Sequence, residues 1–226
     1  MRTTSFPTGD SADFAFTPEN DERAKTIMAR YPEGRQSSAM IALLDLAQRQ
    51  NGGWLSVPAI EYVANYLDVA PIRAHEVASF YSMFNEKPVG KYFIQVCRTT
   101  PCWLRGSDGI TETCKKKLGV GLREVSEDGL FSVIEVECLG ACANAPMVQI
   151  NDHYYEDLTP ERMAEIIDQL RAGEEVPVGS QTGRLSSAPE GGPQTLLDAG
   201  SPGARPGASP GASPGGSPGP NPGEAD

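Results

Sequence analysis

With 226 residues, the chain is long enough for one or two domains, and its formal net charge is −11. A chain this acidic repels the phosphates of nucleic acids, which excludes DNA or RNA as an expected partner. No stretch approaches the roughly 20 apolar residues that a membrane-spanning helix needs, and Met1 to Asp10 lack the features of a signal or targeting peptide. We therefore expect a soluble, cytoplasmic protein without a direct membrane span.

The N-terminal part predicts a flexible arm over 1–17 and a small helical bundle over 18–90. Four segments with apolar residues at helical spacing begin at capping or proline signals, at Thr17-Pro18-Glu19, Ser38, Ser56 and Ala70-Pro71. The aromatic residues Phe80, Tyr81 and Phe84 are interpreted as part of the core. The third and fourth helices could form a DNA-reading helix-turn-helix, but Arg73 is the single Arg or Lys of the fourth, which favours packing or partner docking.

Residues 91–175 predict a second domain of strands and helices. Period-2 patterns predict strands over 92–96, 122–125, 130–136, 147–150 and 153–156. Helical spacing predicts helices over 107–118 and from Thr159-Pro160-Glu161 to Gly173. Strand, helix and strand followed by a hairpin and a helix is the order of a thioredoxin-like domain. The predicted fold class is therefore α+β, with a helical bundle followed by a thioredoxin-like α/β domain.

The tail, 176–226, differs in composition from the rest of the chain. From Ser201 it repeats a four-residue unit that contains Pro-Gly. Pro-Gly favours isolated turns, and the tail has too few apolar side chains to offset the entropy lost on ordering. We predict that this Pro/Gly-rich tail is disordered.

Four of the five cysteines form two close pairs. Cys97 and Cys102 are spaced C-x4-C, and Cys138 and Cys142 are spaced C-x3-C. An odd number of cysteines without a secretory signal disfavours a disulfide framework. Soft thiolates suit a zinc ion or an iron–sulfur cluster, and the wide spacing within each pair favours a [2Fe–2S] cluster over zinc. A structural zinc site with four cysteine ligands and a set of buried structural cysteines remain the alternatives.

The residues around the cysteines add to this interpretation. Thr99, Thr100, Gly140 and Ala141 are small enough for backbone N–H groups to approach the sulfurs. At about 1.5 Å per residue, Cys114 lies about 18 Å along a helix beyond Cys102, too far to share a ligand set, so we predict a packed, small hydrophobic residue. The chain has no Gly-rich nucleotide loop, so we expect no catalytic residue. A thiol–disulfide oxidoreductase is disfavoured because no C-x-x-C is present.

The cysteine segments Cys97-Arg98-Thr99-Thr100-Pro101-Cys102 and Val136-Glu137-Cys138-Leu139-Gly140-Ala141-Cys142-Ala143-Asn144-Ala145-Pro146 carry a resemblance to a known family. They resemble the thioredoxin-like [2Fe–2S] subunit, of the 24 kDa type, of respiratory NADH:quinone oxidoreductase (complex I). The stretch 78–84 is similar to that family too, and the resemblance covers about residues 18–175.

This resemblance implies that Cys97, Cys102, Cys138 and Cys142 ligate one [2Fe–2S] cluster. It also implies an electron-transfer subunit of an oxidoreductase, without a catalytic site of its own. The expected partners are the flavin subunit, which binds FMN and NADH, and other subunits of the peripheral arm, so the chain would lie at the inner membrane through the complex. The same subunit type occurs in NAD-linked hydrogenases and formate dehydrogenases, which stay open as host assemblies.

Overall fold

The computed structural model describes residues 13–189. Most of the predicted arm and the Pro-Gly repeats from Ser201 lie outside the described residues. The chain divides into two compact units. One contains the residues up to Ile94 together with Lys115–Ile134, and the other contains Gln95–Cys114 together with the residues from Glu135 onward.

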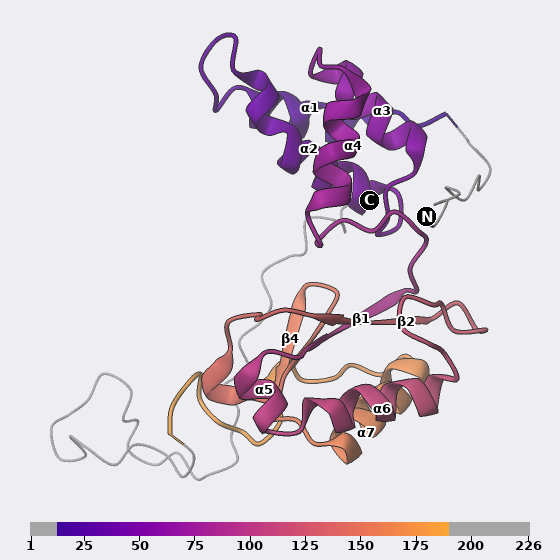
Figure 1. The fold of residues 1–226 in the computed structure, drawn as a ribbon, viewed down its shortest axis with the longest axis vertical. Coiled ribbons are helices and arrows are strands. Elements are labelled where there is room, and N and C mark those ends of the chain that lie inside the picture. Colours follow the sequence, from indigo (N-terminus) through magenta and orange to yellow (C-terminus); the bar gives the residue numbers. More distant parts are fainter. Residues whose placement is uncertain (1–12, 190–226) are drawn as a thin grey trace, which may run out of the picture. The chain divides into compact units, whose positions relative to one another are not determined.

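The predicted helical bundle is present in the first unit (Figure 1). Its helices are α1 (Pro18–Met28), α2 (Met40–Gln50, preceded by a 3-10 turn over Gln36–Ala39), α3 (Val57–Tyr66) and α4 (Pro71–Phe80). The Thr17 hydroxyl accepts a hydrogen bond from the backbone N–H of Asn20, and the Ser56 hydroxyl accepts one from Ala59. Two of the predicted start signals are therefore N-caps that satisfy free N–H groups of the first helical turn.

The prediction that Phe80 and Tyr81 belong to the core is wrong. Phe80 is 79% exposed and Tyr81 is 40% exposed, whereas Phe84 is buried. Helix α4 ends at Phe80, and Tyr81 has an extended backbone conformation (φ −87°, ψ 119°). The helical period therefore stops before Phe84, which reaches the bundle core from the following turn instead.

A five-stranded sheet carries the rest of the fold, in the order β2-β1-β3-β4-β5. The strands are β1 (Tyr92–Cys97), β2 (Phe131–Val136), β3 (Val148–Ile150), β4 (His153–Glu156) and β5 (Gly179–Ser180). β1 and β2 are paired in parallel. Hydrogen bonds run from Tyr92 N to Leu130 O and from Arg98 N to Val136 O, and the donor and acceptor positions differ by the same number of residues in both. β3 and β4 form the predicted antiparallel hairpin. The strand predicted over 122–125 contributes an isolated bridge between Val125 and Ser132.

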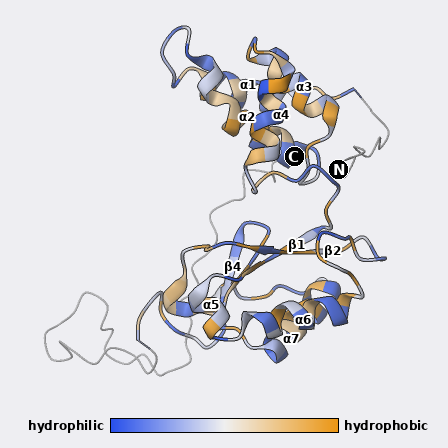
Figure 2. Cartoon of the chain, viewed as in Figure 1, coloured by the Kyte–Doolittle hydropathy of each residue, from blue (hydrophilic) through white to orange (hydrophobic). Residues whose placement is uncertain are grey.

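Three further helices accompany the strands, namely α5 (Thr100–Leu104), α6 (Ser107–Leu118) and α7 (Pro160–Arg171). Figure 2 shows hydrophilic and hydrophobic residues alternating along α6 and α7, as expected for helices with one buried side. The starts of these two helices pack closely, because a Cβ added at Gly109 would lie 3.2 Å from Cγ of Pro160. The α+β fold class with a thioredoxin-like arrangement is thus confirmed, although the short α5 was not predicted.

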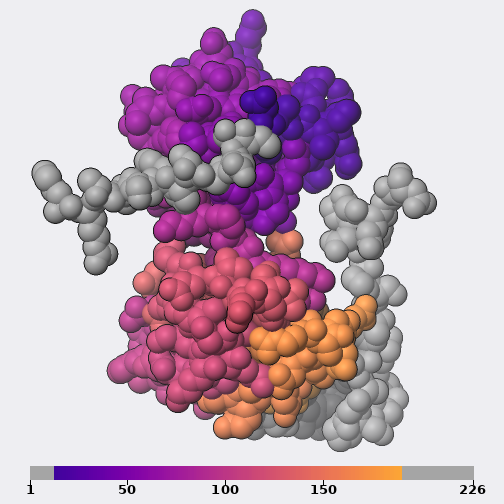
Figure 3. All heavy atoms as spheres, turned by 90° about the vertical axis from the view of Figure 1, so that its right-hand side faces the viewer, coloured from indigo at the N-terminus to yellow at the C-terminus, as the bar shows by residue number. Residues whose placement is uncertain are grey.

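Residues 176–189 are ordered, although they were assigned to the disordered tail. Val176 is buried, and β5 pairs in parallel with β4. In Figure 3 the late described residues, in orange, form part of a closely packed surface. Contacts that composition does not reveal continue to Ser186, whose carbonyl accepts a hydrogen bond from Asn144. Over the described range, no helix has both the length and the apolar character needed to cross a membrane.

Candidate metal centre

The four paired cysteines all lie in the second unit, where two loops follow the ends of β1 and β2. Cys97 is the last residue of β1 and Cys102 lies within α5, and both are almost fully buried. Cys138 follows β2 and Cys142 begins a 3-10 turn over Cys142–Asn144, and both are exposed. The centre therefore has a buried side and an exposed side.

Each cysteine pair is close. The Sγ atoms of Cys138 and Cys142 are 3.5 Å apart. Two thiolates on one tetrahedral metal at about 2.3 Å would be separated by about 3.8 Å. The side chains of Cys97 and Cys102 also interact by a hydrogen bond. The distance within the second pair is thus compatible with the edge of a tetrahedral site.

The electrostatic interactions connect the two pairs with each other. Burial raises the pKa of the Cys102 thiol, helped by the hydrogen bond with Cys97 and by the charges of Cys97 and Cys142. The hydrogen bond with Cys138 raises the pKa of Cys142, and burial and the charges of Cys138 and Cys97 act in the same direction. The thiolate forms of Cys102 and Cys142 are therefore disfavoured by their neighbours, and a bound cation would compensate for this.

Apolar side chains surround the buried pair of cysteines. Cys97, Cys102, Ala145 and Met147 form one buried cluster, against which Leu139, Ala141 and Tyr154 pack. The backbone of Met147 contacts the first cysteine pair, because its carbonyl accepts a hydrogen bond of 3.3 Å from Cys97 N. A backbone hydrogen bond from Met147 also lowers the pKa of Cys102, against the effect of burial. Met147 follows the cis peptide bond between Ala145 and Pro146.

Hydrogen bonds and an ion pair hold the two loops together. The Thr99 hydroxyl donates to Glu137 Oε2 at 3.2 Å, and the Arg98 guanidinium lies 3.3 Å from Glu135 Oε2. The Tyr154 hydroxyl donates to the carbonyl of Leu139 at 2.8 Å. The first cysteine loop is therefore joined to the end of β2, and the second loop to β4.

The second loop depends on a glycine. Gly140 has φ +90°, and no atom lies within 4 Å of the Cβ that another residue would add there. The requirement for glycine is therefore conformational, since L-residues rarely adopt this backbone geometry. In the loop that contains this glycine, the Sγ atoms of Cys138 and Cys142 lie 3.5 Å apart.

The candidate donor set consists of two cysteine pairs. Within residues 13–189, no three side chains of His, Cys, Asp or Glu gather closely enough to bind one metal ion. A [2Fe–2S] cluster has different requirements, because two thiolates bind each of two irons. The arrangement of the thiols in two pairs is compatible with such a cluster.

The strands predicted over 92–96 and 130–136 end close to Cys97 and Cys138, but the sequence does not reveal the residues that support the second loop. Asn144 is buried, and its side-chain amide donates to Glu156 and to the carbonyl of Ser186. Arg184 donates to the carbonyl of Ala143 and pairs with Asp157. The signal in the sequence is Arg184 itself, an isolated arginine among small residues. The composition of this stretch alone assigns it to the tail.

A family model of the thioredoxin-like [2Fe-2S] ferredoxin matches residues 24–171. Curated relatives include the E subunit of the NADH-quinone oxidoreductase of Rickettsia bellii, which is 65% identical over 159 residues and covers 70% of this chain and 95% of the relative. "NADH dehydrogenase [ubiquinone] flavoprotein 2, mitochondrial" of Dictyostelium discoideum is 50% identical over 185 residues, covering 82% of this chain and 75% of the relative.

A solved structure of an NAD+-reducing [NiFe]-hydrogenase in the H2-reduced state is also similar, with a TM-score of 0.52 and 20% identity. The match covers 62% of this chain and 23% of the hydrogenase chain. At this identity the similarity concerns the fold alone.

Proposed function

Because this chain belongs to the family of thioredoxin-like [2Fe-2S] ferredoxins, we propose that Cys97, Cys102, Cys138 and Cys142 hold one [2Fe–2S] cluster. The observation that carries the proposal is the arrangement of the thiols as two close pairs, with 3.5 Å between Sγ of Cys138 and Sγ of Cys142. The bound cluster would supply one-electron redox chemistry.

The chain's own residues would hold and orient the cluster. Cys97 and Cys102 would bind from the buried side, where Met147 and Ala145 exclude water. Cys138 and Cys142 would bind from the exposed side. Electron exchange with a partner would therefore run through the side of Cys138 and Cys142.

We propose that this partner is the flavin subunit of an NADH:quinone oxidoreductase, and that electrons pass singly between its FMN and this chain. NADH would be oxidised on the partner, because the sequence has no nucleotide loop of its own. Trp103 and Leu104 are 56% and 71% exposed, and Leu104 lines a cavity together with Cys142, so they offer apolar surface for docking on that side. Through the complex, the chain would lie at the cytoplasmic face of the membrane with other peripheral-arm subunits.

The alternative host is an NAD-linked hydrogenase or formate dehydrogenase, where a chain of this kind would serve the same role. The fold is similar to a chain of an NAD+-reducing hydrogenase. Identification of the subunits that co-purify with this chain separates the hosts.

Spectroscopy of the purified protein tests the cluster. We expect about two irons and two acid-labile sulfides per chain, visible charge-transfer bands, and paramagnetism in the reduced form alone. Colourless protein loaded with zinc after anaerobic preparation would overturn the proposal. Replacing any of the four proposed ligands by Ala should remove or destabilise the cluster.

A further inference from the structure

The C-terminal segment 176–189 contacts the second cysteine loop, although the cysteines themselves lie far upstream. β5 joins it to the edge of β4, with Tyr155 opposite Gly179 and Glu156 opposite Ser180. Beyond β5, Arg184 and Ser186 reach the residues that follow Cys142. The segment is therefore attached at the cluster loop as well as at the sheet.

Arg184 makes the central contacts of this attachment. Its Nη2 lies 2.8 Å from Asp157 Oδ1, and the two side chains are 13% and 5% exposed. Its Nη1 donates to the carbonyl of Ala143 at 2.9 Å. The planar guanidinium thus joins a buried carboxylate to the backbone directly after Cys142.

Both partners of Arg184 are fixed by other groups. The Ser180 hydroxyl donates to Asp157 Oδ2 at 2.6 Å, which holds the carboxylate towards the segment. Asn144, next to Ala143, donates from its amide to Glu156 Oε2 at 2.7 Å and to Ser186 O at 2.8 Å. These hydrogen bonds consequently hold the 3-10 turn that begins with Cys142.

Arg184 also shares a cavity with a proposed ligand. Cys142 and Arg184 both line a cavity of about 380 Å³, together with Pro101 and Leu104 from the first cysteine loop. A change at Arg184 therefore affects the turn that orients the Cys142 thiol. It also changes the polarity of the cavity beside that thiol.

We propose that Arg184 is a positioning residue for the [2Fe–2S] centre, acting through the Ala143 carbonyl on the geometry of Cys142. This inference rests on the proposed function, because it assumes that Cys142 is a ligand. Residues that orient ligands typically change metal affinity by about 10- to 100-fold when they are replaced. The segment 176–189 is then part of the metal centre and not an appendage of the domain.

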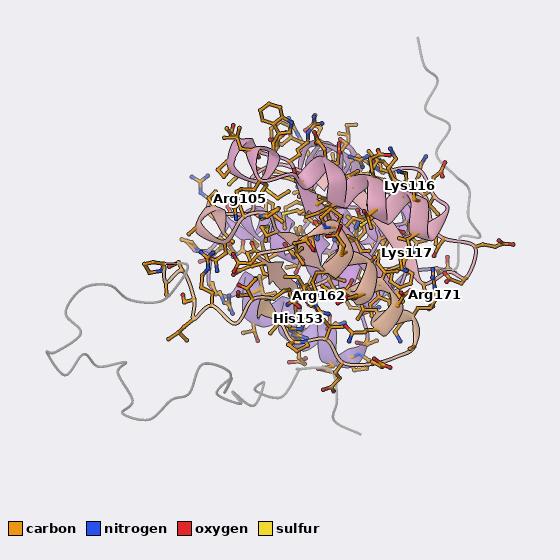
Figure 4. The ribbon with its side chains drawn as sticks, turned by 90° about the horizontal axis from the view of Figure 1, so that it is seen from below. Arg105, Lys116, Lys117, His153, Arg162 and Arg171 are labelled. Atoms are coloured by element: carbon orange, nitrogen blue, oxygen red, sulfur yellow. The ribbon has the colours of Figure 1, made fainter. Side chains whose placement is uncertain are left out.

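Arg162→Gln is a matched control for Arg184→Met. Arg162 also holds the C-terminal segment, since its Nε and Nη2 donate to Gln181 Oε1 at 3.1 and 3.0 Å. Arg162 lies on α7, away from Arg105 at the end of α5, as Figure 4 shows. No contact described for it reaches the cysteine loops, so its loss loosens the segment without changing Cys142 directly.

The experiment uses the full chain with its cluster. Wild type, Arg184→Met, Arg184→Lys and Arg162→Gln are compared by the rate of bleaching in excess chelator, by the reduction potential, and by the g values of the reduced form. We expect Arg184→Met to bleach about 10- to 100-fold faster with altered g values, and Arg184→Lys to recover part of the difference. Arg162→Gln should keep the wild-type spectrum.

Two results would overturn the inference alone: Arg184→Met with wild-type bleaching and g values, or equal changes in Arg184→Met and Arg162→Gln. A wild-type protein without a [2Fe–2S] spectrum would overturn the proposed function, and this inference with it. If Arg184→Met does not fold because it leaves Asp157 buried and unpaired, the double variant Arg184→Met/Asp157→Asn removes both charges and is judged by the same criteria.

Discussion

Gly90 lies against the backbone of Phe131 so closely that a Cβ at Gly90 would come within 2.5 Å of the Phe131 carbonyl carbon. The same approach lets Gly90 N donate a hydrogen bond of 2.7 Å to Ser132 Oγ in the interior. The chain enters β1 through this contact, so the start of the sheet requires a residue without a side chain.

Gly90→Ala should therefore destabilise the protein by at least about 1–3 kcal/mol, the usual range for overpacking, because the obstructing atoms are backbone and cannot rotate away. Chemical denaturation measures the change in the free energy of unfolding. Gly121→Ala is the control, since a Cβ there would meet the flexible Glu124 carboxylate at 3.0 Å. Equal effects of the two substitutions would contradict the steric argument.

Gly140→Ala should weaken the cluster more than it weakens the fold. The strain of a non-glycine residue at φ +90° is about 1–3 kcal/mol, and relaxation of the loop would move Cys138 away from Cys142. The rate of bleaching in excess chelator measures this effect. Gly173→Ala introduces similar strain at φ +76° after α7, again with no atom within 4 Å of the added Cβ, and should leave that rate unchanged.

Cys114→Ala should keep the visible spectrum. Cys114 is 0% exposed within α6, as predicted for a packed residue. We expect a loss of stability of about 1 kcal/mol, the centre of the range for single substitutions. Bleaching of this variant, with retention of the cluster in Cys142→Ala, would show that the proposed ligand set is wrong.

The pH dependence of the same variant gives a separate prediction. Burial raises the pKa of the Cys114 thiol from its ordinary value of 9.0 to about 12. Between these values the unfolded chain loses this proton and the folded chain keeps it. The contribution of Cys114 to stability is therefore complete below pH 9 and falls by up to about 1.4 kcal/mol per pH unit as the pH rises towards 12.

Denaturation curves of wild type and Cys114→Ala from about pH 7 to about pH 11 provide the measurement. The stability advantage of the wild type over the variant should shrink above pH 9, the ordinary pKa of the thiol, while other titrating groups cancel in the difference. A difference that stays constant with pH would contradict a raised pKa at Cys114.

Leu104→Asp should weaken docking to the flavin subunit by about tenfold or more while the isolated chain keeps its cluster. An exposed leucine beside the proposed centre is a candidate anchor, and a carboxylate there would be buried unpaired in the complex. Titration with the purified flavin subunit measures the change. Val178→Asp, at a side chain that is 57% exposed, should bind as the wild type does.

Two truncations test the extent of the ordered domain. Removal of 190–226 should leave cluster content and stability unchanged, because the Pro-Gly repeats offer few apolar side chains for packing. Removal of 176–226 should lower both, since it deletes β5 and the ion pair of Arg184 with Asp157. Iron content and thermal melting of the two truncated proteins are the measurements, and equal behaviour would contradict the inference about the C-terminal segment.

Local patterns in the sequence predicted the features that depend on neighbouring residues. Thr17 and Ser56 cap their helices by accepting hydrogen bonds from N–H groups three residues further along the chain. The β3–β4 hairpin follows from the alternation of apolar and polar residues on either side of Asn151 and Asp152. The strand predicted over 92–96 likewise agrees with β1, which ends one residue later at Cys97. Such features need no knowledge of distant contacts.

Features that depend on tertiary contacts were not predictable in this way. The ion pair of Asp157 with Arg184 involves a segment whose composition indicates disorder. The exposure of Phe80 results from the point at which α4 ends, which an apolar pattern does not specify. The position of Cys102 inside α5 depends on a helix of five residues, too short to produce a clear period.

The two-residue strand β5 has a consequence for the behaviour of the protein during assembly. A bare edge strand offers unpaired N–H and C=O groups to any other extended chain and so promotes aggregation. β5 covers the outer edge of β4, and Gln181 N donates to Glu156 O directly beyond it. On the opposite side of the sheet, the bridge of Val125 with Ser132 occupies part of the edge of β2. A chain synthesised up to β4 alone would expose its hairpin to neighbouring copies until β5 was added, so we expect the C-terminal segment to limit self-association as well.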